Sequence, residues 1–415
     1  MTDVLDPQGP VIAPVPRVTI QAFCETPEVA SAIEASAGDR RMQKAHVRVQ
    51  TGGAPAAAAA FSQAPTPNVV ILEAERGDRG AFLTQLDKLS DVCDPGTKVL
   101  VIGHVNDVLL YRELVRRGVS EYMIAPVAVL DIVRTISELY TAPGVDPVGR
   151  TLAVVGAKGG VGSSTIAHNL AWSFSRKLAM STVVVDLDIA FGTAGLDFNQ
   201  DPPQGIAEAI FAPDRLDANM VDRLMSKCSD KLSLLAAPAM LDRTCDLTET
   251  SLDAIYDILR SAVPCIVLDV PHTWTAWARR TLIGADDVVI VASPDLASLR
   301  NTKNLFDHLK LHRPNDRLPR IVLNQTGVPK RPEIAMADFA KALGTDLSAS
   351  IAFDAQLFGT ATNNGQMIDE VQPSGKAAAT FMEIAGQIVG RGEAKRARSA
   401  LLEPLIAKLS RRKAS

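Results

Sequence analysis

A glycine-rich turn between a strand and a helix constrains this chain more than any other feature of its sequence. The run VGAKGGVGSST, residues 155–165, follows an apolar stretch and opens the helical pattern IAHNLAWSFSRKL. Its glycines let successive N–H groups face one concavity at a helix N-terminus, where the peptide dipoles favour an anion. The sequence therefore predicts a phosphate-binding loop. The residues expected to bind the phosphates are Lys158, Gly159, Gly160, Val161, Gly162, Ser163, Ser164 and Thr165.

This loop departs from the common G-x-x-x-x-G-K-[ST] pattern at two positions. Ala157 occupies the place of the first glycine, and Ser163 stands where that pattern has a lysine. Ser164 is placed to offer its hydroxyl to Mg²⁺, and Thr165 could hydrogen-bond a phosphate oxygen. Without other motifs in the chain, such a glycine-rich run could also be a purely structural turn between a strand and a helix.

Short β-branched runs alternate with helical patterns along most of the chain, in two series. Such alternation favours right-handed βαβ units and parallel sheets covered on both faces. We therefore expect an α/β protein in which a five-stranded domain precedes a larger, doubly wound domain that carries the loop. The expected parts are a disordered segment over 1–16, the five-stranded domain over 17–140, a linker over 141–150, the larger domain over 151–390 and a basic tail over 391–415.

Composition excludes several other classes of protein. With 415 residues, 47% hydrophobic and 22% charged, the chain is long enough for two to three globular domains. A net charge of −4 argues against coating nucleic acid through bulk positive charge. The five cysteines form no C-x-x-C pair, which favours a reducing compartment over a disulfide framework. Without a signal-peptide pattern or a long apolar run, we expect a cytoplasmic protein.

Polar residues end three strands that follow the loop, in DLD at 186–188, in IVLD ending at Asp269 and in LNQT around Asn324. Together with Lys158 before the paired glycines, these segments resemble the ParA/MinD family of deviant Walker A ATPases, whose loop reads K-G-G-x-G-K-[ST]-[ST]. The resemblance implies a doubly wound P-loop NTPase domain that binds ATP and Mg²⁺. It also implies a homodimer with ATP at the interface, in which Lys158 would reach the partner's nucleotide.

The resemblance implies roles for individual carboxylates. Asp188 would orient the attacking water, supported by Asp186, and would act with Lys158 as a catalytic residue. Ser164 would bind Mg²⁺ directly, and Asp269 would hold it through water. Carboxylates at the ends of buried strands can instead cap the turn that follows.

The resemblance also implies which residues would contact the adenine base of the nucleotide. Asn324 would contact the adenine, aided by Phe353 and Asp354, although Asn324 could simply satisfy backbone groups. Because Ser163 replaces a cation, we expect ATP binding with slow or nearly absent hydrolysis.

Four features resemble one branch of the family, the CpaE/TadZ proteins of Tad (Flp-type) pilus assembly. They are Ser163 in the loop, LDVPHTW at 268–274, PEIAMADFAKALG at 332–344 and FDAQLFGTATNNGQMIDEV at 353–371. This resemblance implies an assembly or positioning factor that works with the pilus secretion machinery or a polar landmark protein, at the cell pole. A ParA-type partition ATPase that binds DNA is the alternative, and no sequence-specific nucleic acid is expected.

Residues 17–140 resemble the receiver-like domain that such proteins carry ahead of the ATPase domain. A working receiver has an aspartate acceptor on its third strand and a lysine before a proline. Here Glu73 occupies the acceptor position and Ala125 precedes Pro126. We therefore expect an interaction or localisation module rather than a phosphorelay input.

Two further segments carry open alternatives. The tail 391–415 has eight basic and two acidic residues and leucines at helical spacing, so it could contact the inner membrane peripherally or dock on the protein itself. His308 and His312 are four residues apart, but without a neighbouring ligand motif a surface helix is favoured over a zinc site.

Overall fold

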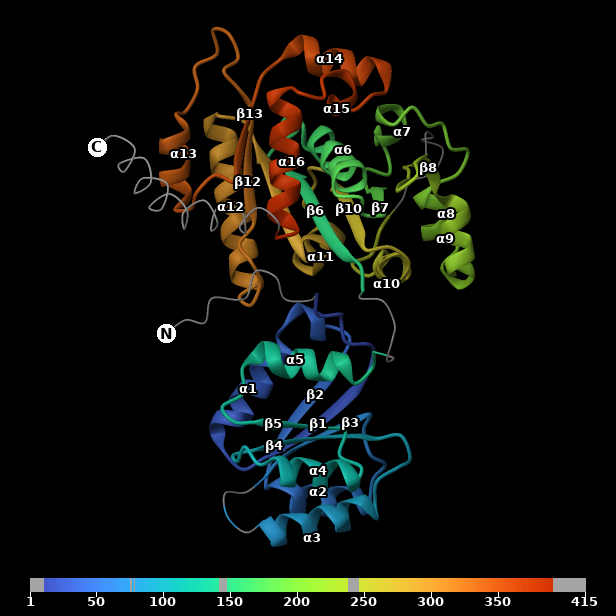
Figure 1. Cartoon of the computed structure of the whole chain (residues 1–415), viewed down its shortest axis with the longest axis vertical. Coiled ribbons are helices and arrows are strands. Elements are labelled where there is room, and N and C mark those ends of the chain that lie inside the picture. Colours follow the sequence, from blue (N-terminus) through green and yellow to red (C-terminus); the bar gives the residue numbers. More distant parts are fainter. Residues whose placement is uncertain (1–10, 75–76, 78, 142–147, 238–245, 391–415) are drawn as a thin grey trace, which may run out of the picture. The chain divides into compact units, whose positions relative to one another are not determined.

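The chain divides into two compact units, one over residues 12–146 and the other from residue 147 onward. The computed structural model describes residues 11–74, 77, 79–141, 148–237 and 246–390 (Figure 1). The basic tail, residues 1–10 of the N-terminal segment and residues 142–147 of the linker lie outside them. No helix in these described ranges has the length and apolar character that crossing a bilayer requires.

The described part of the N-terminal segment, residues 11–16, forms no helix or strand. Val15 is nevertheless fully buried, and its N–H donates to the carbonyl oxygen of Arg41. Residues 12–16 are therefore fixed to the first unit, in contrast to the disorder expected over 1–16. Its burial was not visible in the sequence because the contact joins residues far apart in the chain.

The first unit is a five-stranded parallel sheet in the order β2-β1-β3-β4-β5. Its strands are β1 (Thr19–Cys24), β2 (His46–Thr51), β3 (Val69–Glu73), β4 (Lys98–Gly103) and β5 (Glu121–Ile124). Its helices are α1 (Pro27–Ala37), α2 (Gly53–Phe61), α3 (Arg79–Ser90), α4 (Val108–Arg116) and α5 (Val129–Glu138), with a 3-10 turn at Arg40–Met42. Helices α1 and α5 cover one face of the sheet and α2, α3 and α4 the other (Figure 1). This strand order is that of the flavodoxin-like fold, which confirms the expected receiver-like architecture.

The second unit is built on an eight-stranded sheet in the order β13-β12-β11-β6-β10-β7-β9-β8. Its strands are β6 (Arg150–Gly156), β7 (Thr182–Asp186), β8 (Ser226–Ser229), β9 (Leu232–Leu235), β10 (Cys265–Val270), β11 (Asp287–Ala292), β12 (Arg320–Thr326) and β13 (Ala349–Ala352). The pairs are parallel except β8 with β9. Strands β8 and β13 form the two edges of this sheet.

Helices cover both faces of this sheet, as a doubly wound domain requires (Figure 1). They are α6 (Ser163–Trp172), α7 (Ala194–Asp197), α8 (Ile206–Phe211), α9 (Ala218–Leu224), α10 (Asp253–Ala262), α11 (Ala276–Gly284), α12 (Leu296–His312), α13 (Met336–Leu343), α14 (Ala355–Asn364), α15 (Ile368–Val371) and α16 (Lys376–Ile388). A π-helical turn, Ser173–Lys177, extends α6, and a 3-10 turn at Pro213–Arg215 follows α8.

Alternate residues of the central strands face two separate cores. Val154 of β6 packs toward α6 and α16, and Val155 packs toward α10, α11 and α12. Because both faces are buried, the strands read as continuous apolar runs in the sequence. The central place of β6, between β10 and β11, brings the glycine-rich loop beside the carboxyl ends of its neighbours.

The core between α6 and α16 yields a stability prediction. Phe381 of α16 is 1% exposed, so Phe381→Ala should lower the free energy of unfolding by about 3–5 kcal/mol through lost contacts and a residual cavity. Urea titration followed by tryptophan fluorescence reports this unit alone, because Trp172, Trp274 and Trp277 all lie in it.

Phe211→Ala is the matched control for this measurement, because Phe211 is 45% exposed. The control should change the free energy of unfolding by less than about 0.5 kcal/mol. Equal effects of the two substitutions would contradict the placement of α16 in the core.

Candidate functional site

The glycine-rich loop runs from the end of β6 to the start of α6 and depends on left-handed backbone at two glycines. Gly160 has φ of 81° and Gly162 has φ of 83°. A Cβ atom on Gly162 would also lie 2.7 Å from Nδ2 of Asn324. Glycine is therefore required at residue 162 for both conformation and space.

Side chains from three other segments hold the carbonyl oxygens of the loop. His272 Nδ1 lies 2.9 Å from the oxygen of Gly156, and Asn301 Nδ2 donates to that of Ala157 at 2.9 Å. The remaining two donors lie at the end of β12: Asn324 Nδ2 donates to the oxygen of residue 161 at 2.8 Å, and Gln325 Nε2 to that of residue 160 at 2.9 Å.

The N–H groups of the same loop are left available. Within the part of the chain that the structure describes, those of residues 158–162 donate no hydrogen bond. The carbonyl oxygens of the loop are therefore bound by side chains of the protein. Its N–H groups remain free to donate to a ligand at the start of α6. This is the arrangement in which successive amides bind an anion.

Lys158 forms an ion pair within its own chain. Its Nζ lies 2.7 Å from Oδ2 of Asp295, which also caps the N-terminus of α12 by accepting from the N–H of Ser298. Burial alone would raise the pKa of Asp295, but hydrogen bonds from Lys158, Ser293 and the Ser298 N–H lower it to about 2. Asp295 therefore stays ionised, and the ion pair must open before Lys158 could reach a second subunit.

Two buried carboxylates lie side by side beyond the loop. Asp186 of β7 and Asp269 of β10 are direct partners in the parallel ladder and are 1% and 5% exposed. Burial, followed by the nearby charge of Asp269, raises the pKa of Asp186 to about 7. Oδ2 of Asp186 accepts from the N–H of Ala194, and a Cβ on Gly192 would lie 2.3 Å from the same oxygen. The turn after β7 therefore closes tightly around this carboxylate.

Asp188 lies just after β7 and is partly exposed. Its Oδ1 accepts from the N–H of Phe191, and its own N–H donates to Oδ1 of Asp186. Asp188 thus caps the turn, which was the alternative reading from the sequence. Its role in orienting water stays a prediction.

His168 is a site residue that the sequence analysis missed. It is fully buried on α6, with Nδ1 2.7 Å from Oδ2 of Asp197. Its Nε2 lies 3.4 Å from Oδ2 of Asp269, which is an ion-pair contact rather than a hydrogen bond. Burial alone would lower the pKa of His168, but the two carboxylates raise it to about 10. A buried imidazolium therefore joins the carboxylate of β10 to the end of α7.

The sequence contained one signal for this histidine. His168 is four residues after Ser164, so both lie on the same face of α6, at the helical spacing that brings side chains together. Asp197 has no comparable signal, because the turn between β7 and α7 decides where it lies.

Asn324 and the pair Phe353 and Asp354, which were expected to contact the adenine, lie on different segments: Asn324 on β12, and the pair just before α14. Asn324 is 6% exposed and binds the loop, so its amide fills the alternative role of satisfying a backbone group. Phe353 is 42% exposed and Asp354 caps α14, its carboxylate accepting from the N–H of Leu357 at 2.9 Å. The N–H of Phe353 donates to the oxygen of Thr326, two residues after Asn324. Contact of these residues with adenine stays a prediction.

The remaining loop residues open α6. Ser163, Ser164 and Thr165 are its first three residues and are all partly exposed. The binding of Mg²⁺ by Ser164, with Asp269 acting through water, is compatible with this placement and stays a prediction.

His308 and His312 lie together on one face of α12. The rings of His308 and His312 stack with their centroids 4.1 Å apart, and Arg279 donates to Nε2 of His308. Among the residues that the structure describes, no group of three or more histidine, cysteine or acidic side chains could hold a metal ion.

In the first unit, the carboxylate of Glu73 is fully used by neighbours. One oxygen accepts from the N–H groups of Glu25 and Thr26, both at 2.8 Å. The other lies 2.7 Å from the Thr26 hydroxyl and 3.1 Å from Nε2 of His104. Glu73 therefore joins the ends of three strands, as a structural group at the acceptor position would.

The loop, the strand-end carboxylates and the two sheets define a P-loop NTPase domain of ParA/MinD type preceded by a receiver-like domain. The family model described as an AAA domain matches residues 149–318. The septum site-determining protein MinD of Bacillus subtilis is 22% identical over 258 residues, which cover 59% of this chain and 90% of that protein. The structure of a ParA family ATPase from Chlorobium tepidum is 25% identical and covers 57% of this chain and 98% of its own, with a TM-score of 0.51.

A third comparison concerns the N-terminal part of the chain. The structure of the pilus assembly protein CpaE from Caulobacter crescentus is 47% identical to this chain. The match covers 32% of this chain and all of the solved one, with a TM-score of 0.31. The family assignment depends on this 47% sequence identity over the full length of the solved chain. The chain belongs to the family of CpaE pilus assembly proteins.

The buried charges of the site predict how stability depends on pH. Asp186 and His168 both have raised pKa values, so each holds a proton more tightly in the folded protein than in the unfolded chain. Stability is then lost as pH rises, through about pH 4–7 for Asp186 and about pH 6.5–10 for His168. Tryptophan fluorescence in urea should show the free energy of unfolding falling by at least ~1 kcal/mol between pH 5 and pH 8.

Asp186→Asn should flatten the part of this dependence below pH 7, because the substitution removes the titrating carboxyl group. Asp230→Asn, at a side chain that is 93% exposed, is the control and should leave the slope unchanged. A free energy of unfolding that rises from pH 5 to pH 8 would show that these groups are not buried as described.

Proposed function

We propose that this chain is an ATP-binding assembly and positioning factor of the Tad (Flp-type) pilus machinery. The observation that carries the proposal is the loop of residues 158–162: its N–H groups have no partner among the described residues, while side chains bind the carbonyl oxygens of residues 160 and 161. A triphosphate with Mg²⁺ is the guest that such a cradle suits, since the amides supply donors and Ser164 a hydroxyl for the metal. The identity to a CpaE pilus assembly protein supports the pilus context.

Hydrolysis of the bound ATP is proposed to be slow. Ser163 stands where a lysine would contact the transferring phosphoryl group, and a cation there can raise the rate by on the order of a thousandfold. Binding is less affected, because the loop amides can replace part of a charge-assisted contact of about 1.5–3 kcal/mol.

Nucleotide is proposed to control dimerisation. Lys158 is 38% exposed, so its ion pair with Asp295 is accessible to a second subunit. ATP bound between two copies would draw Lys158 away from Asp295 and join the copies. The dimer would then mark the nucleotide state for the pilus secretion machinery or a polar landmark protein.

We further propose a cytoplasmic position at the cell pole, at the periphery of the inner membrane. The receiver-like domain would act as the interaction or localisation module, since its Glu73 is occupied by structural contacts. The basic tail, residues 391–415, would supply the membrane contact. A ParA-type partition ATPase is the second candidate, favoured by the 25% identity to a ParA family ATPase.

Ser163→Lys tests the account of slow turnover. The variant should raise kcat for ATP hydrolysis at least about tenfold, because it restores a cation at the phosphoryl group. A coupled assay for ADP measures this, with Ser261→Lys, at an exposed serine of α10, as the matched control. Hydrolysis by the unaltered protein as fast as by the variant would overturn the proposal of weak turnover.

The cellular role is tested by deleting the gene and restoring variants. Deletion should abolish pili, and Lys158→Ala should fail to restore them because the proposed dimer needs this side chain. Lys177→Ala is the control: Lys177 is 42% exposed and pairs with Asp369, away from the loop. Normal pili after deletion would reject the pilus role, and salt-dependent DNA binding by the purified chain would favour the partition ATPase.

A further inference from the structure

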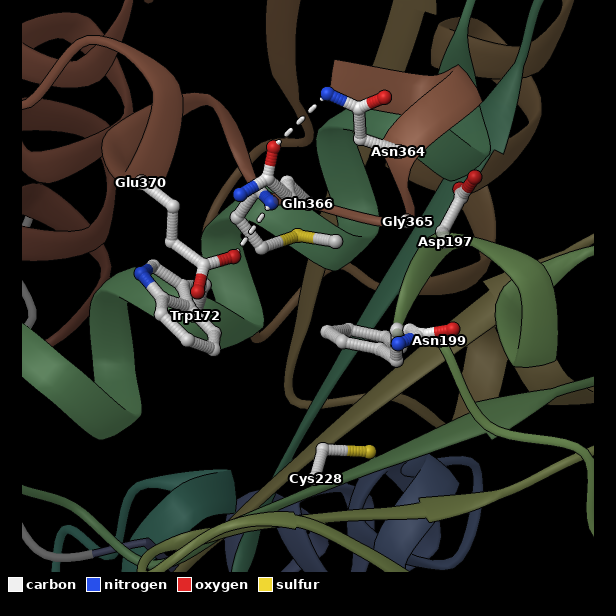
Figure 2. Close-up of a pocket in the computed structure, with 10 residues that line it drawn as sticks. Trp172, Asp197, Asn199, Cys228, Asn364, Gly365, Gln366 and Glu370 are labelled. Carbon is white, nitrogen blue, oxygen red and sulfur yellow. Dashed lines mark hydrogen bonds between the residues drawn. The ribbon is translucent and has the colours of Figure 1, made fainter. Parts of the chain in front are cut away.

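A second pocket lies in the ATPase-type domain, behind the turn that follows β7. Its volume is about 580 Å³, within the range of small-molecule sites. The end of α6, the end of α7, strand β8 and the turn between α14 and α15 form its walls (Figure 2). The residues that line it are Trp172, Asp197, Phe198, Asn199, Cys228, Asn364, Gly365, Gln366, Met367 and Glu370.

Close backbone contacts build the walls of this pocket. Gly365 ends α14 with φ of 60°, and a Cβ atom there would lie 2.8 Å from the oxygen of Leu196 and 3.0 Å from Cβ of Asn199. Glu370 accepts from the N–H of Met367 at 2.8 Å and so fixes the start of α15 (Figure 2). The α14–α15 turn is therefore held against the end of α7.

The lining favours a cation. It contains two carboxylates, Asp197 and Glu370, together with the aromatic rings of Trp172 and Phe198, and no basic side chain. Carboxylates pair with ammonium and guanidinium groups, and aromatic faces attract them. Trp172 is 8% exposed, so its ring forms a largely buried part of the wall.

Two basic side chains that follow α6, near Trp172, have other contacts. The guanidinium of Arg176 lies 5.4 Å from the centre of the Trp172 ring, which shows that this ring already attracts such a group. Lys177 pairs with Asp369 at 2.9 Å. Neither residue lines the pocket, so the charge of Glu370 is not matched from within it.

The pocket connects directly to the candidate nucleotide site. Asp197 lines the pocket and contacts Nδ1 of His168 at 2.7 Å, and the other nitrogen of the same ring is 3.4 Å from Asp269. One buried side chain thus separates the pocket from the carboxylate of β10. A group that binds Asp197 would compete with His168 for it and change how His168 contacts Asp269.

We propose that this pocket binds an alkyl-guanidinium or alkyl-ammonium group, and that its occupancy is coupled to the nucleotide site through Asp197 and His168. The group comes from a free amine such as a polyamine or from a basic side chain of a partner segment. The proposal that the pocket binds a cation depends only on its lining residues. The proposal that this binding is coupled to the nucleotide site rests on the proposed binding of ATP.

Binding is tested first without nucleotide, on the full chain, by calorimetry and ligand-observed NMR. The probes are agmatine for the free amine, the peptide acetyl-Gly-Arg-Gly-amide for the protein segment, and N-butylurea as an uncharged analogue. We expect saturable binding of at least one charged probe, with the tighter one identifying the source, and none of N-butylurea. Failure of both charged probes to bind, or equal binding of N-butylurea, would overturn the proposal.

Glu370→Gln locates the site. This variant keeps an oxygen for the N–H of Met367 but removes the charge, so the affinity for the charged probe should fall about tenfold. Asp369→Asn is the matched control, since Asp369 is the neighbouring carboxylate and does not line the pocket. An affinity unchanged by Glu370→Gln, or lowered equally by both, would place the probe elsewhere.

The coupling is tested by measuring the affinity for a fluorescent ATP analogue with Mg²⁺, with and without saturating agmatine. A change of at least about fivefold is expected, together with an equal reciprocal change in agmatine affinity. His168→Gln should retain agmatine binding and lose the change. Independent binding of the two ligands would overturn the coupling, and absence of nucleotide binding would reject the proposed function while leaving agmatine binding as evidence for the pocket.

Discussion

The site depends on how the carbonyl oxygens of one loop are held. Four side chains, from the segment after β10, from α12 and from the end of β12, bind the oxygens of residues 156, 157, 160 and 161. Parallel strands make this possible, because their carboxyl ends meet at one edge of the sheet. The N–H groups of residues 158–162, which donate to no other described residue, then stay available to an anion.

Buried charged side chains near the loop contact one another. Asp186, Asp197 and Asp269 lie close together, and His168 contacts two of them. An uncompensated carboxylate in this position would cost several kcal/mol, and His168 supplies a positive charge to Asp197 and Asp269. The same ring lies between Asp197, which lines the pocket at the end of α7, and the carboxylate of β10.

The sequence predicted the fold and the loop well, because both leave local signals. Continuous apolar runs mark strands buried on two faces, and paired glycines between a strand and a helix mark the phosphate loop. The contacts of Lys158 with Asp295 and of Asn324 with residue 161 could not be predicted, since they join side chains 137 and 163 positions apart. His168 resembles an ordinary polar residue of an amphipathic helix until Asp197 is placed beside it.

Calorimetric titration of the full chain with ATP and Mg²⁺ measures whether the loop of residues 158–162 binds a nucleotide. We expect saturable heat with one nucleotide per chain, and loss of that heat in Gly162→Val, whose side chain would displace Asn324 from the loop. Absence of heat from the unaltered chain, even at high protein concentration, would contradict the account.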